Sequence, residues 1–141
     1  MVYNVDNNGL ARAVVYAVMC AAEFVDAPDF DDPYQLHQFL RERIKYSADL
    51  DPDWQLLRMP WRTTTDGTTD CKSSAIFIGG LTYAAGHHVV IRFTDEFGTG
   101  QWNHVYAIVN GIACDPLLPY GVEPPAMRTC DIFLHSYHVD E

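Results

Sequence analysis

Hydrophobic residues dominate the N-terminal part of the chain in a pattern that predicts a helix. Residues 9–25 are almost entirely apolar and rich in Ala and Val, which is typical of a helix buried inside a fold. Asn7 or Asn8 precedes this run and would cap the helix, because a side-chain oxygen there accepts a hydrogen bond from a first-turn amide.

A second helix is predicted over residues 33–46. Asp31 or Asp32 is a suitable cap, and Pro33 suits the first helical position because its φ angle is already helical. Apolar side chains recur at helical spacing, and the other face is polar and expected to be solvated. The apolar positions are Leu36, Phe39, Leu40 and Ile44, and the polar ones are Gln38, Arg41, Glu42 and Lys45.

The middle of the chain predicts a long loop followed by a third helix. Residues 47–70 carry Asp-Pro, Met-Pro, a Thr run and Asp-Gly, and loops of this length in compact domains are usually functional. Residues 71–85 predict a helix that ends at Gly86. Its interior Gly79 and Gly80 each cost about 1 kcal/mol relative to Ala, so we expect another element to pack closely there.

The C-terminal half predicts strands, at residues 88–94, 102–109, 112–114 and 129–135. Asn110-Gly111 between two apolar runs favours a two-residue type I′ hairpin. With helices first and strands afterwards, the chain predicts one α+β domain over residues 1–141, with N-terminal helices and a Cys-bearing helix packed on an antiparallel sheet.

The register of this hairpin places a histidine beside an aspartate. Paired residue numbers should sum to about 221, so that Val109 faces Ile112 and Tyr106 faces Asp115. Because side chains alternate, Asp115 becomes the diagonal same-face neighbour of His104, about 7 to 8 Å away along the backbone. Alone, such a His and Asp are most often a hydrogen-bonded surface pair.

Cys71 changes the meaning of that pair. It follows Asp70 at the predicted start of a helix, where the partial positive charge of the helix N-terminus favours a thiolate. A nucleophilic Cys, a His that moves the proton and an Asp that orients the imidazole form the arrangement that acyl chemistry requires. The sequence thus predicts a site made of Cys71, His104 and Asp115.

At these residues the chain resembles the transglutaminase-like superfamily, within the wider papain-like fold of cysteine enzymes. The resemblance covers about residues 33–120, and within the superfamily the chain is similar to small bacterial and phage members. Its motifs are Thr69-Asp70-Cys71-Lys72-Ser73-Ser74-Ala75, Asn103-His104-Val105-Tyr106, Cys114-Asp115-Pro116, Ile44-Lys45-Tyr46 with Asp49, and Arg58-Met59-Pro60. The resemblance implies a nucleophile at Cys71, a general base at His104 and an orienting acid at Asp115. The backbone N–H of Cys71 would supply part of an oxyanion hole.

The side-chain donor of the oxyanion hole is left open by the sequence. Papain-type enzymes carry Gln six residues before the Cys, where this chain has Thr65. Candidates for the oxyanion donor are Trp61, Gln101 and Asn103. Trp61 and Trp102 could also form an aromatic wall over the thiol, with core packing as the alternative for each.

Charge and hydropathy exclude two classes of partner. The 141 residues include 9 Lys and Arg against 19 Asp and Glu, a net charge of −10, and the one basic group is Arg41, Arg43 and Lys45. Nucleic-acid binding needs a basic stripe, so we expect none. Residues 10–25 are too short for a bilayer span and contain Arg12, so we expect no membrane span.

The expected location is the cytoplasm or a virion, because the residues before the apolar run have no basic group and do not resemble a signal peptide. The four cysteines include no CxxC pair and predict free thiols. Cys20 and Cys114 are expected to be buried packing residues, and Cys130 could be either buried or exposed. A zinc site at Cys130, His135 and His138 lacks the usual ligand spacing, so we expect no metal and no organic cofactor.

The predicted function is that of a thiol hydrolase or acyltransferase acting on an amide bond of a protein or peptide. Water is the favoured acceptor, hence a cysteine protease or amidase, because the domain is too small to offer an obvious site for a second protein substrate. The alternative is a phage or virion structural or assembly protein that keeps the fold without the chemistry. Fold resemblance alone does not choose between them.

Overall fold

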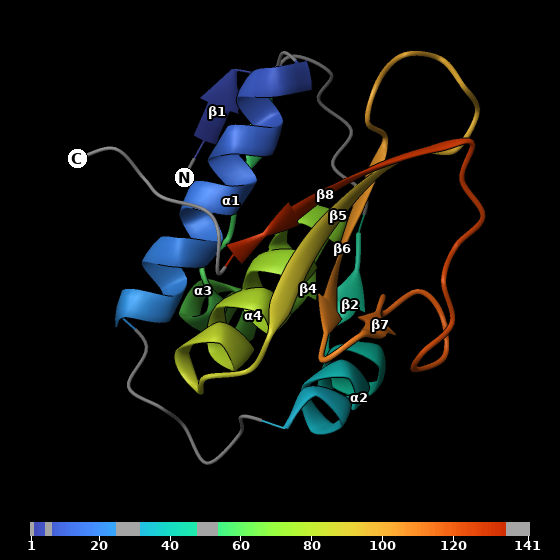
Figure 1. The fold of residues 1–141 in the computed structure, drawn as a ribbon. Coiled ribbons are helices and arrows are strands. Elements are labelled where there is room, and N and C mark those ends of the chain that lie inside the picture. The colour runs from blue at the N-terminus through green and yellow to red at the C-terminus, as the bar shows by residue number, and fades with distance from the viewer. Residues whose placement is uncertain (1, 5–6, 25–31, 48–53, 135–141) are drawn as a thin grey trace.

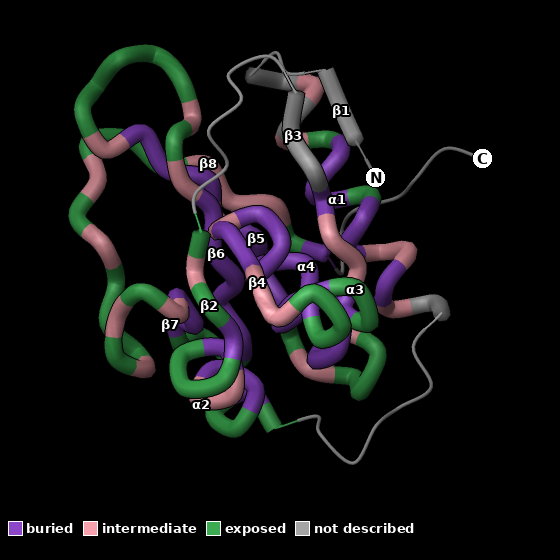
Figure 2. Tube along the Cα trace, turned by 180° about the vertical axis from the view of Figure 1, so that it is seen from behind, coloured by how far each residue is buried: buried purple, intermediate pink, exposed green. Residues whose placement is uncertain are grey.

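The helix α4 (Cys71–Ala84) occupies the centre of the molecule, between the main sheet and helix α1 (Asn7–Phe24) (Figure 1). The computed structural model describes residues 2–4, 7–24, 32–47 and 54–134. Eleven of the fourteen α4 residues are buried, which fits its central place (Figure 2). The other helices are α2 (Pro33–Arg43) and α3 (Pro60–Asp66). The expected α+β class is confirmed.

Helices α1 and α4 approach closely at the two glycines of α4, as the sequence predicts. A methyl group on Gly80 would lie 2.7 Å from Cβ of Ala21, and one on Gly79 would lie 3.0 Å from Cδ1 of Ile91. Only glycine leaves room for this contact. Helix α1 is not buried on all sides, however, because Tyr16 is 47% exposed. Its buried face is Ala13, Val14, Val15, Ala17, Val18 and Ala21.

The second helix begins as predicted but ends earlier. Asp32 caps it through a 3.3 Å hydrogen bond from the amide of Tyr34, and Pro33 holds the first helical position. Asp31, the other expected cap, lies outside the described residues. The helix stops at Arg43, and the prediction of a helix to residue 46 is wrong. Instead strand β2 (Lys45–Tyr46) pairs in parallel with β4 (Thr68–Thr69), and this tertiary pairing overrides the helical pattern.

The expected loop over residues 47–70 contains regular structure. Besides β4 it holds strand β3 (Trp54–Leu56), which pairs with β1 (Val2–Asn4), and the short helix α3. Helix α3 begins at Pro60 and ends at Asp66, and the following Gly67 has a left-handed φ of 70°. A proline at the start and a glycine just past the end are the usual signals of a helix, so the sequence carried evidence against a plain loop.

The main sheet is antiparallel, with the strand order β7-β6-β5-β8. The strands are β5 (Val89–Asp95), β6 (His104–Val109), β7 (Ile112–Cys114) and β8 (Arg128–Phe133), each close to its predicted range. Buried residues of β5 and β6 form the core together with those of α4, and all three elements are largely buried in Figure 2. The predicted antiparallel sheet under a Cys-bearing helix is thus observed.

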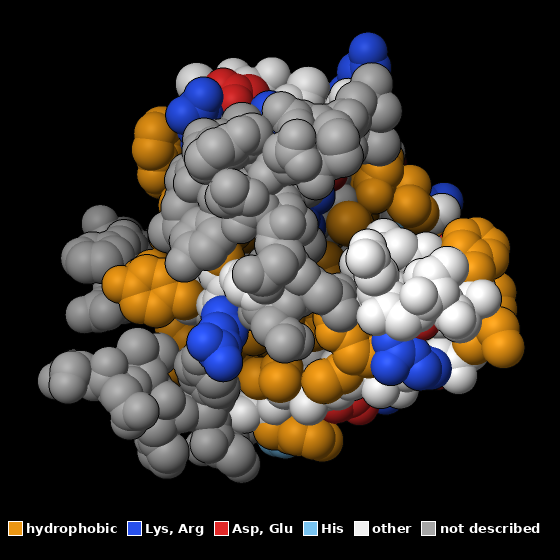
Figure 3. Space-filling model, turned by 90° about the horizontal axis from the view of Figure 1, so that it is seen from above, with side chains coloured by type: hydrophobic (Ala, Val, Ile, Leu, Met, Phe, Trp, Pro, Cys, Tyr) orange, Lys and Arg blue, Asp and Glu red, His pale blue; other side chains and the backbone are white. Residues whose placement is uncertain are grey.

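Large apolar side chains also reach the surface. Trp61 is 69% exposed, Phe97 71% and Met127 72%. Figure 3 shows one face on which hydrophobic side chains lie among Lys and Arg side chains. Among the described helices, none has the length and apolar character needed to cross a membrane.

Candidate active site

The β6–β7 hairpin brings His104 and Asp115 together as predicted. Asn110 and Gly111 form the turn with φ angles of 53° and 80°, which are typical of a type I′ turn, and Val109 pairs with Ile112. Nε2 of His104 donates a hydrogen bond to Oδ2 of Asp115 at 2.6 Å. The two side chains are 9% and 2% exposed, so this is a buried pair and not a surface one.

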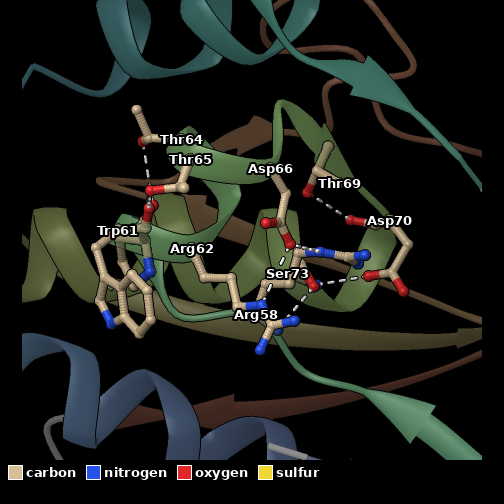
Figure 4. Close-up of polar contacts among 10 residues, drawn as sticks. Arg58, Trp61, Arg62, Thr64, Thr65, Asp66, Thr69, Asp70 and Ser73 are labelled. Carbon is tan, nitrogen blue, oxygen red and sulfur yellow. Dashed lines mark hydrogen bonds and ion pairs between the residues drawn. The ribbon is translucent and has the colours of Figure 1, made fainter.

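Cys71 is the first residue of α4, and Asp70 is its cap. Oδ1 of Asp70 accepts from the amide of Ser73 at 2.8 Å, while its backbone oxygen accepts from the amide of Ser74. Figure 4 shows the Asp70 side chain directed at Ser73, whose hydroxyl accepts a hydrogen bond from the Arg58 amide. These contacts fix the backbone immediately after Cys71. The Cys71 side chain itself is half-buried.

Cys71 also interacts directly with His104. The Cys71 side chain is close enough to influence the ionisation of the imidazole, and because Nε2 is engaged with Asp115, Nδ1 is the nitrogen that remains for the sulfur. Burial by itself lowers the pKa of His104. Hydrogen bonds and charge interactions with Asp115 and Cys71 outweigh that effect and raise the pKa to about 10. The imidazole is therefore held in its protonated form at neutral pH.

Tyr46 is a further member of the site. Its side chain lies close enough to Cys71, Asp70 and Asp115 for all three to influence its hydroxyl. Burial, and then the neighbouring Cys71 and Asp70, raise the pKa of the Tyr46 hydroxyl far above its usual value. The hydroxyl thus keeps its proton and remains a hydrogen-bond donor.

Helix α2 holds the turn that carries Asp115. Nε2 of the fully buried His37 donates to the backbone oxygens of Asp115 at 2.9 Å and Leu118 at 3.0 Å. One helical turn further on, Nη1 of Arg41 donates to the oxygen of Pro116 at 3.1 Å. The carboxylate also accepts from the amide of Leu117 through Oδ1 at 3.0 Å. Asp115 is fixed through its backbone and through both carboxylate oxygens.

A buried ion pair flanks the cysteine. Nζ of Lys72 lies 3.1 Å from Oδ2 of Asp70, and the two side chains are 8% and 3% exposed. Since Asp70 directly precedes Cys71, its negative charge would oppose a thiolate there. Lys72 offsets that charge within the same turn of the helix.

The side chains named from the sequence as oxyanion or substrate candidates have other positions. Trp61 lies on α3 and is largely exposed, away from Asp70 in Figure 4. Gln101 and Asn103 lie in the β5–β6 loop, where Oδ1 of Asn103 accepts from the amide of Glu96 at 3.1 Å. Trp102 packs against the core under the guanidinium of Arg128, 4.5 Å from the ring centroid. Among the described residues, Trp61, Gln101 and Asn103 form no hydrogen bond with Cys71.

The other cysteines differ from Cys71. Cys114 is buried as expected, and burial raises the pKa of its thiol to about 12. Cys20 is half-buried, so the expectation that it is a buried packing residue is wrong, and Cys130 is half-buried as well. His135 and His138 of the weighed zinc site lie outside the described residues, as does Asp49. Among the residues that are described, no group of His, Cys, Asp and Glu is arranged to hold a metal ion.

Two site residues, His37 and Tyr46, were missed by sequence reasoning. Tyr46 is in the Ile44-Lys45-Tyr46 segment of the resemblance, but the local pattern predicts that it ends a helix. Its contact with Cys71 depends on the parallel β2–β4 pair, for which two-residue strands leave little signal. His37 could have been noticed as a polar residue beside Leu36 on the apolar face of its helix.

No protein-family model, curated protein or solved structure matches the chain. The site must therefore be interpreted from its own chemistry.

Proposed function

We propose that this protein is a cysteine-dependent amide hydrolase of the transglutaminase-like, papain-like type, with Cys71, His104 and Asp115 as its catalytic residues. The observation that carries the proposal is the 2.6 Å hydrogen bond from His104 to Asp115, made by an imidazole that also lies near Cys71. A nucleophile, a proton carrier and an orienting carboxylate in mutual contact are what covalent acyl transfer requires.

The raised pKa of His104 favours an imidazolium paired with a Cys71 thiolate. The thiolate attacks the amide carbon, a C–S bond forms, and the carbonyl electrons move onto oxygen. Collapse of this intermediate breaks the C–N bond, and Nδ1–H of His104 donates its proton to the departing amine. The product of this half-reaction is a thioester on Cys71.

Water completes the cycle. The neutral imidazole takes a proton from the attacking water, the C–S bond breaks, and a carboxylic acid leaves while the thiolate and imidazolium are restored. Asp115 keeps the imidazole in one orientation during both half-reactions and stabilises its protonated form. The backbone N–H of Cys71, at the N-terminus of α4, supplies one donor to the oxyanion.

The test is a substrate panel of peptide amides, glutamine donors with an amine acceptor, and peptidoglycan fragments, followed by mass spectrometry of the rapidly quenched protein. We expect cleavage of at least one amide substrate and an acyl adduct on Cys71. Cys71→Ala should abolish both. Cys114→Ala is the matched control, because that thiol is buried, and it should keep both.

Formation of a new amide with the amine acceptor, in place of hydrolysis, would show that the acceptor is an amine and not water. The acyl transfer through Cys71 would still be supported. Absence of turnover and of any Cys71 adduct over the whole panel would contradict the proposal. The catalytically silent structural or assembly role would then be the better account.

A further inference from the structure

Tyr46 reaches the cysteine from a separate part of the chain. Strand β2 runs parallel to β4, which leads directly into α4, and Tyr46 pairs with Thr69 two positions before Cys71. The amide of Ser47 donates to the oxygen of Thr69 at 2.8 Å and continues this pairing. The backbone of Tyr46 is thus tied to the segment that positions the nucleophile, and its hydroxyl is near the Cys71 side chain.

The oxyanion of an acyl reaction forms next to this hydroxyl. In the intermediate, the carbonyl carbon is bonded to the Cys71 sulfur. The oxyanion is bonded to that same carbon, so it is only two bonds away from the sulfur. A donor that contacts the sulfur in the empty site is therefore within reach of the oxyanion when negative charge moves from sulfur to oxygen. Hydroxyl side chains are among the donors that form oxyanion holes.

We propose that Tyr46 is the side-chain oxyanion donor of this site and rests on the Cys71 sulfur when no substrate is bound. The inference rests on the proposed function, since an oxyanion forms only if Cys71 attacks a carbonyl. The second donor is the backbone N–H of Cys71, which points outward at the start of α4.

The electrostatic surroundings suit this role. The charges of Cys71, Asp70 and Asp115 act on the hydroxyl from the start of α4, its cap and the residue after β7, while Lys72 is paired with Asp70. Burial and these acidic neighbours keep the proton on Tyr46. A neutral donor of this kind can stabilise the oxyanion by a hydrogen bond without first losing its proton to the thiolate.

The experiment compares two reactions of the same thiol in the Tyr46→Phe variant of the full chain. Alkylation by iodoacetamide displaces iodide from a saturated carbon and forms no oxyanion. Acylation by p-nitrophenyl acetate releases p-nitrophenolate through an oxyanion intermediate and leaves an acetyl thioester on Cys71. The variant removes one oxygen atom and keeps the ring, so the packing around β2 should be retained.

We expect acylation of the Tyr46→Phe variant to slow by about 100-fold, the order found when one oxyanion donor is removed. Alkylation at a pH where its rate has reached a plateau should change less than about twofold. Tyr34→Phe is the matched control, because Tyr34 lies exposed on α2, and it should leave both rates unchanged.

Equal slowing of both reactions would overturn the inference, because Tyr46 would then act on the thiol itself. Unchanged acylation would overturn it as well. In both cases acylation of the wild-type protein would leave the proposed function intact. A wild-type protein that is alkylated at Cys71 but never acylated would instead contradict the proposed function, and the role of Tyr46 with it.

Discussion

The imidazole of His37 donates a hydrogen bond to the backbone oxygen of Asp115 at 2.9 Å, although 78 positions separate the two residues in the sequence. Nδ1 of the same ring accepts from Nε2 of Gln38 at 3.1 Å, so both ring nitrogens have partners. The contact ties helix α2 to the turn that presents the carboxylate to His104. His37 is in this way a positioning residue for the site.

Replacing His37 by Leu should loosen that turn. The change removes the donor to the buried backbone oxygen of Asp115. We therefore expect the free energy of unfolding, measured by chemical denaturation, to fall by about 1 to 3 kcal/mol. The pKa of His104 should also fall, because its carboxylate partner is held less firmly. His37→Gln can place an amide donor near the position of Nε2 and should restore part of both. An unchanged His104 titration in His37→Leu would mean that His37 serves stability alone.

The titration of His104 tests the electrostatics of the site directly. Asp115 and Cys71 favour the imidazolium, so the ring should stay protonated at neutral pH and lose its proton near pH 10 in NMR spectra of isotope-labelled histidine. Cys71→Ala and Asp115→Asn should each lower this pKa, since each removes a partner of the charged ring. A titration near the ordinary 6.5 in the wild-type protein would contradict the described pairing.

The same shift predicts how stability changes with pH. The folded protein binds the His104 proton more tightly than the unfolded chain does, so this group stabilises the fold fully below about pH 6.5. That contribution is lost as the pH rises through about 10. The difference in unfolding free energy between wild type and His104→Asn should therefore shrink between these two pH values. A difference that stays constant with pH would contradict the linkage.

Gly80 tests the packing of α1 on α4. An added methyl group would lie 2.7 Å from Cβ of Ala21, and overpacking of this kind typically costs about 1 to 3 kcal/mol. The better helix propensity of Ala offsets about 1 kcal/mol of this cost, so Gly80→Ala should lower the free energy of unfolding by about 1 kcal/mol net. Gly79→Ala should cost less, because its closest neighbour is the flexible end of Ile91. Thermal unfolding of both variants provides the comparison, and a Gly80→Ala variant as stable as wild type would contradict the close contact.

The parts of the site that could be predicted depend on local sequence. Asn110-Gly111 fixes the hairpin register within a few residues, and this alone pairs His104 with Asp115. Asp70 likewise marks the start of α4 and so the position of Cys71. Turn and cap signals depend on residues that are neighbours in the sequence, so they can be recognised from one sequence alone.

The parts that were missed depend on distant contacts. Ile44 fits the helical spacing of α2, yet its φ of −113° is extended because the next two residues pair with β4. This pairing places Tyr46 on Cys71, and no local pattern specifies it. The role of His37 is equally hidden in the local sequence, because its partner Asp115 is 78 positions away. Such contacts are decided by packing of the whole domain and override local propensity.

The most direct test of the account is the pH dependence of Cys71 alkylation by iodoacetamide, mapped by mass spectrometry, in wild type and His104→Ala. The central claim is that Cys71 and His104 act as a coupled thiolate–imidazolium pair. The rate of wild-type alkylation should then depart from the simple titration curve of a free thiol, whereas His104→Ala should follow that curve. Superimposable profiles for the two proteins, or preferential labelling of Cys114 over Cys71, would contradict the claim.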